Sequence, residues 1–271
     1  MKLCKFSSLF FSIFILAVVE TNPAQNELGI DPEALIERIL YVEAHKRSEI
    51  NDVILDAEYI EGKRENDGSL KEEKRFIKKI YMRYLTDTTL YQENWLEYYK
   101  DGKLQKPENC DKEATKQTEK KRKRRFFNIS YLMLYPFYPE NRDNYEITYV
   151  GVAEEKIDRY VCHHFQVKAK EEHRNGINGD YYFEAESFNL VRVDFSPTKL
   201  PKGIMFKLNR LNMSILYGPT PEGYWLPRQL DIEGKGKKAF FVGIRFASTE
   251  YYTNPKVNTG IQAEVFEVND D

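Results

Sequence analysis

The sequence has little of what enzymes and metal proteins rely on. Its 271 residues include only 4 histidines and 3 cysteines. It holds no G-x-S-x-G nucleophile motif, no phosphate-binding loop and no H-E-x-x-H zinc motif. His163 and His164 are adjacent in a segment that alternates like a strand, so their side chains point to opposite faces and cannot share one ion. These absences predict a protein that is not an enzyme and that binds no metal or cofactor.

An excess of charge of one sign is also absent. The 41 Lys and Arg residues are balanced by 43 Asp and Glu residues, which leaves a net charge of -2. A nucleic-acid-binding domain usually carries a net basic field, so we expect no nucleic-acid partner. The one concentrated basic run, at about 112–125, is expected to be a solvated loop. The alternative is that this loop contacts anionic lipid headgroups or the acidic face of a partner.

Long apolar runs are confined to the N-terminus. Lys2 and Lys5 precede the uncharged run from Leu9 to Val19, and polar sequence follows. This order is typical of a secretory signal peptide, and the run is shorter than the ~20 residues that a membrane-spanning helix needs. We expect residues 1–25 to be a signal peptide, with Ala24 as the best single cleavage candidate. An uncleaved N-terminal membrane anchor is the alternative.

Cysteine is too scarce for a scaffold built on disulfides. Cys4 lies within the predicted signal peptide, which leaves Cys110 and Cys162 in the exported chain. These two could pair in an oxidising compartment, but one lies in a charged segment and the other in a strand pattern. The sequence leaves their pairing open.

Aromatic residues, by contrast, are abundant. The chain has 19 Tyr and 17 Phe, which favour strands. After about residue 50 nearly every segment alternates with period two, for example Phe76, Lys78, Ile80 and Met82 on one face. Turn signals such as N-D-G-S from Asn66 separate these segments, and their short connections indicate antiparallel neighbours.

One helix is expected before the strands. Asp31 can cap its free amides, and Pro32 suits its first turn. Apolar residues then recur at helical spacing up to about Arg47. Residues 26–271 are therefore expected to form one domain, with one amphipathic helix followed by about ten antiparallel strands. So many strands tend to curl. The sheet either closes and fills itself with side chains or stays open over an apolar cavity, and the composition fits both.

Four segments resemble motifs of the outer-membrane lipoprotein-sorting proteins, the LolA/LolB-like group. The first is N-Y-E-I-T-Y-V-G-V-A-E-E-K-I-D-R-Y-V-C-H-H-F-Q-V-K-A-K-E-E, from Asn144. The second is G-D-Y-Y-F-E-A-E-S-F-N-L-V-R-V-D-F-S, from Gly179. The third is G-Y-W-L-P-R-Q-L-D-I-E-G-K-G, from Gly223, and the fourth is S-T-E-Y-Y-T-N-P-K-V-N, from Ser248. The four segments occur in the family's order, and the resemblance as a whole runs from about Phe126 to Asn258.

The resemblance implies a mainly β fold: a strongly curved antiparallel sheet that forms an open half-barrel, with the N-terminal helix over its concave face. It also implies a non-enzymatic, monomeric, periplasmic carrier or chaperone for lipoprotein acyl chains or another hydrophobic ligand. The alternative is a lipid-sensing envelope-stress regulator that uses the same cavity and signals to a membrane-protein partner. Alternation and the expected concave surface together predict the cavity-lining residues, which are Phe165, Phe183, Phe206, Leu208 and Phe246.

Overall fold

The structure, a computed structural model, describes residues 30–64, 70–85, 89–124, 135–171, 176–200, 202–203, 206–238 and 242–266. The predicted signal peptide at 1–25 lies outside the described residues. Residues from Asp31 onward form one structural unit.

Helix α1 (Pro32–Glu49) begins where the sequence predicts. Asp31 has an extended backbone, and its Oδ1 accepts a hydrogen bond from the Glu33 N–H at 3.0 Å. Ile36 and Ile39 lie on the apolar stripe and are buried against the sheet. The face of the sheet that α1 contacts is called the inner face below, and the opposite face is called the outer face.

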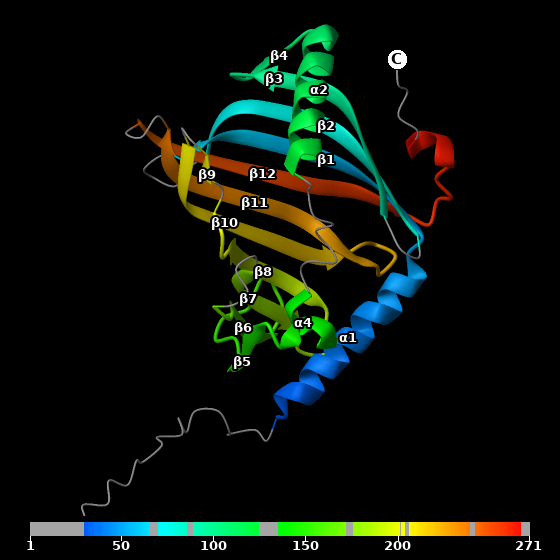
Figure 1. The fold of residues 1–271 in the computed structure, drawn as a ribbon. Coiled ribbons are helices and arrows are strands. Elements are labelled where there is room, and N and C mark those ends of the chain that lie inside the picture. Colours follow the sequence, from blue (N-terminus) through cyan, green and yellow to red (C-terminus); the bar gives the residue numbers. More distant parts are fainter. Residues whose placement is uncertain are drawn as a thin grey trace, which may run out of the picture. The chain divides into compact units, whose positions relative to one another are not determined.

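All the strands of the described residues belong to one antiparallel sheet of 12 (Figure 1). They are β1 (Asp52–Arg64), β2 (Leu70–Tyr84), β3 (Thr89–Lys100), β4 (Lys103–Leu104), β5 (Tyr145–Val152), β6 (Cys162–Ala169), β7 (Ile177–Glu184), β8 (Leu190–Pro197), β9 (Lys202–Gly203), β10 (Phe206–Pro219), β11 (Trp225–Lys238) and β12 (Val242–Val257). The order across the sheet is β4-β3-β2-β1-β12-β11-β10-β8-β7-β6-β5, and β9 pairs with β10.

The two edges of this sheet, β4 and β5, are not paired with each other in the described part of the chain. The sheet is therefore open rather than closed into a barrel, and the prediction of a mainly β, open antiparallel half-barrel is confirmed. The predicted turn from Asn66 lies outside the described residues, whereas the K-D-G-K signal from Lys100 coincides with a turn. Asp101 and Gly102 have φ values of 48° and 73° in this tight turn between β3 and β4.

The basic segment corrects one prediction. Instead of a loop at about 112–125, the chain forms helix α2 (Pro107–Arg124). Cys110 is buried, and Glu113 pairs with Lys74 of β2 at 2.8 Å. These contacts fix the first half of the helix on the sheet, and tertiary contacts of this kind support helices that lack an apolar stripe. Side chains from residue 116 to residue 124 lie outside the described part.

In the part of the chain that the structure describes, three clusters of buried side chains line the inner face. The first lies between α1 and strands β5 to β8 and β10, and includes Phe137 of the short helix η2 (Tyr135–Phe137). The second spans β1, β2 and β11. The third joins α2 to β2 and β3 through Cys110, Phe76 and Tyr98. The inner face is thus well packed toward both edges of the sheet.

Cys110 and Cys162 are both buried and free. Cys110 belongs to the third cluster, whereas Cys162 begins β6, where burial raises the pKa of its thiol to about 11. The two residues therefore form no disulfide, which answers the question that the sequence left open.

One buried carboxylate at the start of β1 accepts hydrogen bonds from the segment that follows β12. Asp52 is 4% exposed, and it accepts hydrogen bonds from the N–H and hydroxyl of Thr259, both at 2.8 Å, and from the N–H of Gly260 at 2.9 Å. Burial alone would raise the pKa of Asp52, but these hydrogen bonds outweigh it, so the pKa is lowered. Asn258, the closing residue of the fourth motif, adds a hydrogen bond to the Glu49 carbonyl at 2.7 Å.

We expect Asp52→Asn to reduce the free energy of unfolding by about 2–3 kcal/mol, because an amide in place of the carboxylate leaves buried N–H donors without acceptors. The lowered pKa means that this contribution is present above the ordinary carboxyl value of 3.8 and is lost as the pH falls through the folded-state pKa. Urea unfolding at neutral and acid pH measures both effects. Asp56→Asn, a less buried change on the same strand, is the control; equal losses for the two variants would contradict the assigned role of Asp52.

Candidate functional site

The predicted cavity residues divide into two groups on the inner face. Phe165 and Phe183 are fully buried in the first cluster, where the Phe137 ring meets both of theirs edge-to-face with centroids 5.8 and 5.6 Å apart. They face inward, as the alternation predicts, and they are packing residues of a filled core. Their contact with a ligand stays a prediction.

Leu208 and Phe246 lie on the same inner face, farther along the sheet. Leu208 is opposite Gly236, and Phe246 is opposite Gly234, across the central strands β10 to β12. A Cβ atom at Gly234 would lie 2.2 Å from Cζ of Phe246, so the absence of a side chain there gives the ring its place. The side chain of Phe206 lies outside the described residues.

Around Phe246 the inner face carries apolar side chains that are only partly covered. Leu211, Ile232, Ile244 and Phe246 are half-buried, and none belongs to the three clusters. Their registers place them together: Leu211 and Phe246 both face Gly234, and Ile244 faces Gly236. These four residues are called the apolar strip below. It crosses the middle of the sheet, between the packed regions.

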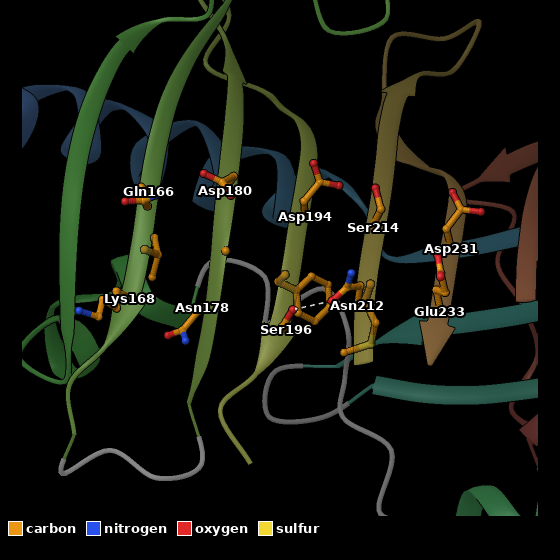
Figure 2. Close-up of a pocket in the computed structure, with 14 residues that line it drawn as sticks. Gln166, Lys168, Asn178, Asp180, Asp194, Ser196, Asn212, Ser214, Asp231 and Glu233 are labelled. Carbon is orange, nitrogen blue, oxygen red and sulfur yellow. Dashed lines mark hydrogen bonds between the residues drawn. The ribbon is translucent and has the colours of Figure 1, made fainter. Parts of the chain in front are cut away.

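The outer face carries a different concavity, of about 610 Å³. Figure 2 shows its lining, which comes from β6, β7, β8, β10 and β11 and consists mostly of amides, hydroxyls and carboxylates. Several of the carboxylates are engaged by neighbours: Asp180 by His164 at 2.9 Å and Asp231 by Thr249 at 2.6 Å. Most side chains that line this concavity are thus polar, in contrast to those of the apolar strip.

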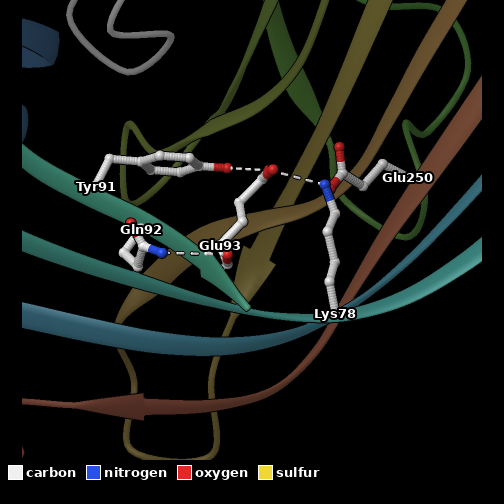
Figure 3. Close-up of polar contacts among 5 residues, drawn as sticks. All are labelled: Lys78, Tyr91, Gln92, Glu93 and Glu250. Carbon is white, nitrogen blue, oxygen red and sulfur yellow. Dashed lines mark hydrogen bonds and ion pairs between the residues drawn. The ribbon is translucent and has the colours of Figure 1, made fainter. Parts of the chain in front are cut away.

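A buried charged cluster adjoins the apolar strip on the inner face (Figure 3). Lys78 of β2 is 2% exposed, and its Nζ lies 2.8 Å from Glu93 Oε1 on β3 and 2.6 Å from Glu250 Oε1 on β12. The Tyr91 hydroxyl donates to the same oxygen of Glu93, and the Tyr252 hydroxyl is hydrogen-bonded to Glu250. Five side chains from three strands therefore form one polar group.

Electrostatics keep Lys78 charged despite its burial. Desolvation alone would lower the pKa of Lys78, but Glu250 and Glu93 more than offset it, so the pKa is raised. The rings of Tyr59 and Trp95 lie 5.6 and 5.2 Å from the ammonium, within the range of cation–π attraction. The cluster is thus an ion-pair network. Burial, together with the nearby carboxylate of Glu61, raises the pKa of the adjacent Tyr59 to about 12.

Sequence reasoning missed this cluster as a site. The signal was available, because Lys78 interrupts the apolar series of Phe76, Ile80 and Met82 on one strand face. A lysine in that register must be buried, and a buried lysine needs carboxylate partners. The sequence could not show that Glu93 and Glu250, 157 residues apart by their numbers, are those partners.

Two findings limit the chemistry of the described residues. They hold no group of three or more His, Cys, Asp or Glu side chains suited to a metal ion. None of their helices has both the length and the apolar character needed to cross a membrane. His163 instead lies in the core, with its Nδ1 3.0 Å from the Tyr149 hydroxyl, and His164 points to the outer face as expected.

The fold and this face define an open antiparallel sheet with a partly covered apolar middle. No family model matches the sequence, and neither does any curated protein. Among solved structures, a putative outer membrane lipoprotein-sorting protein domain from Vibrio parahaemolyticus is similar at 11% identity, over 85% of this chain and 97% of that chain, with a TM-score of 0.41.

Two further solved structures are similar to this chain. A DUF1329 family protein from Desulfovibrio piger ATCC 29098 is 11% identical, over 88% of this chain and 98% of that chain, with a TM-score of 0.43. A LolA superfamily protein from Nitrosomonas europaea is 10% identical, over 86% of this chain and 97% of that chain, with a TM-score of 0.34. Proteins of the group that the sequence motifs resemble are therefore among the structures similar to this chain.

Proposed function

We propose that the chain is an exported, periplasmic, non-enzymatic carrier that binds the acyl chain of a lipid or lipidated protein on its inner face. The observation that carries the proposal is the apolar strip. Leu211, Ile232, Ile244 and Phe246 form a continuous apolar surface that the described helices leave partly exposed. Covering such a surface contributes roughly 25 cal/mol per Å² of apolar area, less the cost of ordering the ligand.

The two sides of the strip support this assignment. The first cluster, under α1, packs the strands on one side of the strip. The second and third clusters pack the strands on the other side. A ligand on the strip would thus meet pre-arranged strands, which reduces the ordering cost of binding.

The proposal is tested with Nile red, an uncharged dye whose emission rises in apolar surroundings. We expect the wild-type protein to bind the dye and dodecanol to displace it. Ile232→Asn should weaken dodecanol binding about tenfold, equivalent to ~1.4 kcal/mol, because an amide replaces apolar contact with the chain. Fluorescence titration gives both affinities.

The matched control is Ile60→Asn, on the outer face of β1 opposite Arg75. It makes the same chemical change away from the strip and should leave dodecanol affinity within about twofold. Wild-type protein that shows no dodecanol-sensitive dye signal would overturn the proposal. Equal losses in the two variants would move the site away from the strip.

A further inference from the structure

The charges of the cluster do not balance, and its three charged side chains differ in exposure. Lys78 contributes one positive charge and Glu93 and Glu250 contribute two negative charges, so the three groups sum to -1. Lys78 and Glu93 side chains are 2% and 6% exposed, whereas Glu250 is 12% exposed. Of the three charged side chains, Glu250 is therefore the one that a partner on the inner face would reach most readily.

The route to Glu250 starts at the apolar strip. Along β12 the inner-face positions are Ile244, Phe246, Ser248, Glu250 and Tyr252, so the face changes from apolar to polar along one strand. Glu250 lies four positions after Phe246 along the strand, a distance of about 13 Å. A dodecyl chain is longer than this, so one amphiphile can cover the strip and place its polar end at the cluster.

Aromatic side chains complete the polar end. Tyr91 is 49% exposed although its hydroxyl is bonded to Glu93 inside the cluster, so its ring borders both the solvent and the charged groups. Tyr252 is half-buried and bonded to Glu250. A carboxylate flanked by aromatic rings in a poorly solvated site favours a cation and disfavours an anion.

Resting on the proposed function, we infer that the ligand of the inner face is an amphiphile with a cationic, hydrogen-bond-donating head group, such as a primary ammonium, which Glu250 binds. An ammonium at Glu250 brings the summed charge of the cluster and the ligand to zero. An anionic carboxylate at the same place would bring it to -2 beside buried carboxylates. The site therefore selects the head group by charge, while the apolar strip selects for an alkyl chain.

The test compares three ligands with the same chain but different heads: dodecylamine, which is protonated at neutral pH, dodecanol and dodecanoate. Displacement of Nile red by each ligand is measured below the critical micelle concentration of that ligand. We expect wild-type protein to bind dodecylamine at least about tenfold more tightly than dodecanoate, with dodecanol between them. Glu250→Gln should remove most of this preference and leave dodecanol binding within about twofold. Glu233→Gln, the same charge change on the outer face, should keep the preference.

Each outcome decides one question. If dodecanol does not displace the dye from wild-type protein, the proposed function falls, and this inference with it. If dodecanol binds but dodecanoate equals or exceeds dodecylamine, only the inference falls. If Glu250→Gln keeps the wild-type preference, Glu250 is not the head-group residue. The preference of the wild-type protein is measured first. If Glu250→Gln fails to fold, the decision rests on wild type and on Glu250→Asp, whose shorter side chain keeps the charge but holds it farther from the ligand.

Discussion

Replacing Lys78 with methionine should destabilise the protein by about 3–5 kcal/mol, because it leaves Glu93 and Glu250 facing each other in a buried site without their cation. The loss is seen as a lower urea midpoint of unfolding. The matched control is Lys79→Met on the same strand. Lys79 points to the outer face, where it is 37% exposed and lies 3.5 Å from Asp56, so its replacement should cost under about 1 kcal/mol.

A rescue separates charge from packing in this prediction. Lys78→Met combined with Glu93→Gln and Glu250→Gln removes all three charges and should recover most of the stability, since well-packed neutral replacements of buried ion pairs are often tolerated. If the triple variant is no more stable than Lys78→Met alone, the loss comes from the shape of the lysine side chain and not from unpaired carboxylates. Equal costs for Lys78→Met and Lys79→Met would contradict the burial of Lys78.

The second large effect is expected at Phe165. Its ring is fully buried among other side chains. The ring centroid lies 5.1 Å from that of Tyr149 and 5.9 Å from that of Phe183. Phe165→Ala should therefore cost about 3–5 kcal/mol through lost burial and the cavity left behind. Phe246→Ala makes the same change on the apolar strip and should cost only about 1–2 kcal/mol, because that ring is only partly buried.

Ligand binding should show the opposite ranking for these two residues. Phe246→Ala removes a surface that the acyl chain covers, so dodecanol affinity should fall about tenfold. Phe165→Ala, in protein that remains folded, should bind dodecanol as wild type does. Dye titration together with urea unfolding gives both rankings. If Phe165→Ala weakens binding as much as Phe246→Ala, the ligand enters the first cluster, and the sequence-based prediction for Phe165 and Phe183 would hold instead.

Most of the fold could be predicted because local patterns and tertiary packing agree. Asp31 and Pro32 specify the start of α1 through a capping bond that needs no tertiary contact. Period-two alternation specifies the strands, since one face of each is buried. Helix α2 could not be predicted, because its sequence has no apolar stripe and its support comes from Cys110 and from the Glu113–Lys74 pair, which only the folded sheet brings together.

The candidate site was predictable only in part, for a similar reason. Alternation correctly placed Phe165, Phe183, Leu208 and Phe246 on one face. It could not separate a filled core from a partly open strip, because both require apolar residues in the same register. The distinction arises from Phe137 and α1, which cover one part of the face and come from segments distant in sequence. The pairing of Lys78 with Glu250 depends on the same long-range arrangement.

The location of a bound chain tests the central claim most directly. A dodecyl chain that carries a nitroxide spin label at its end broadens the NMR signals of nearby methyl groups in protein labelled at Ile and Leu methyls. We expect broadening at Leu211, Ile232 and Ile244 on the apolar strip, reversed by excess unlabelled dodecanol. The outer-face methyls of Ile60 and Ile77 should stay sharp. Equal broadening on both faces, or none on the strip, would contradict a carrier that holds an acyl chain on its inner face.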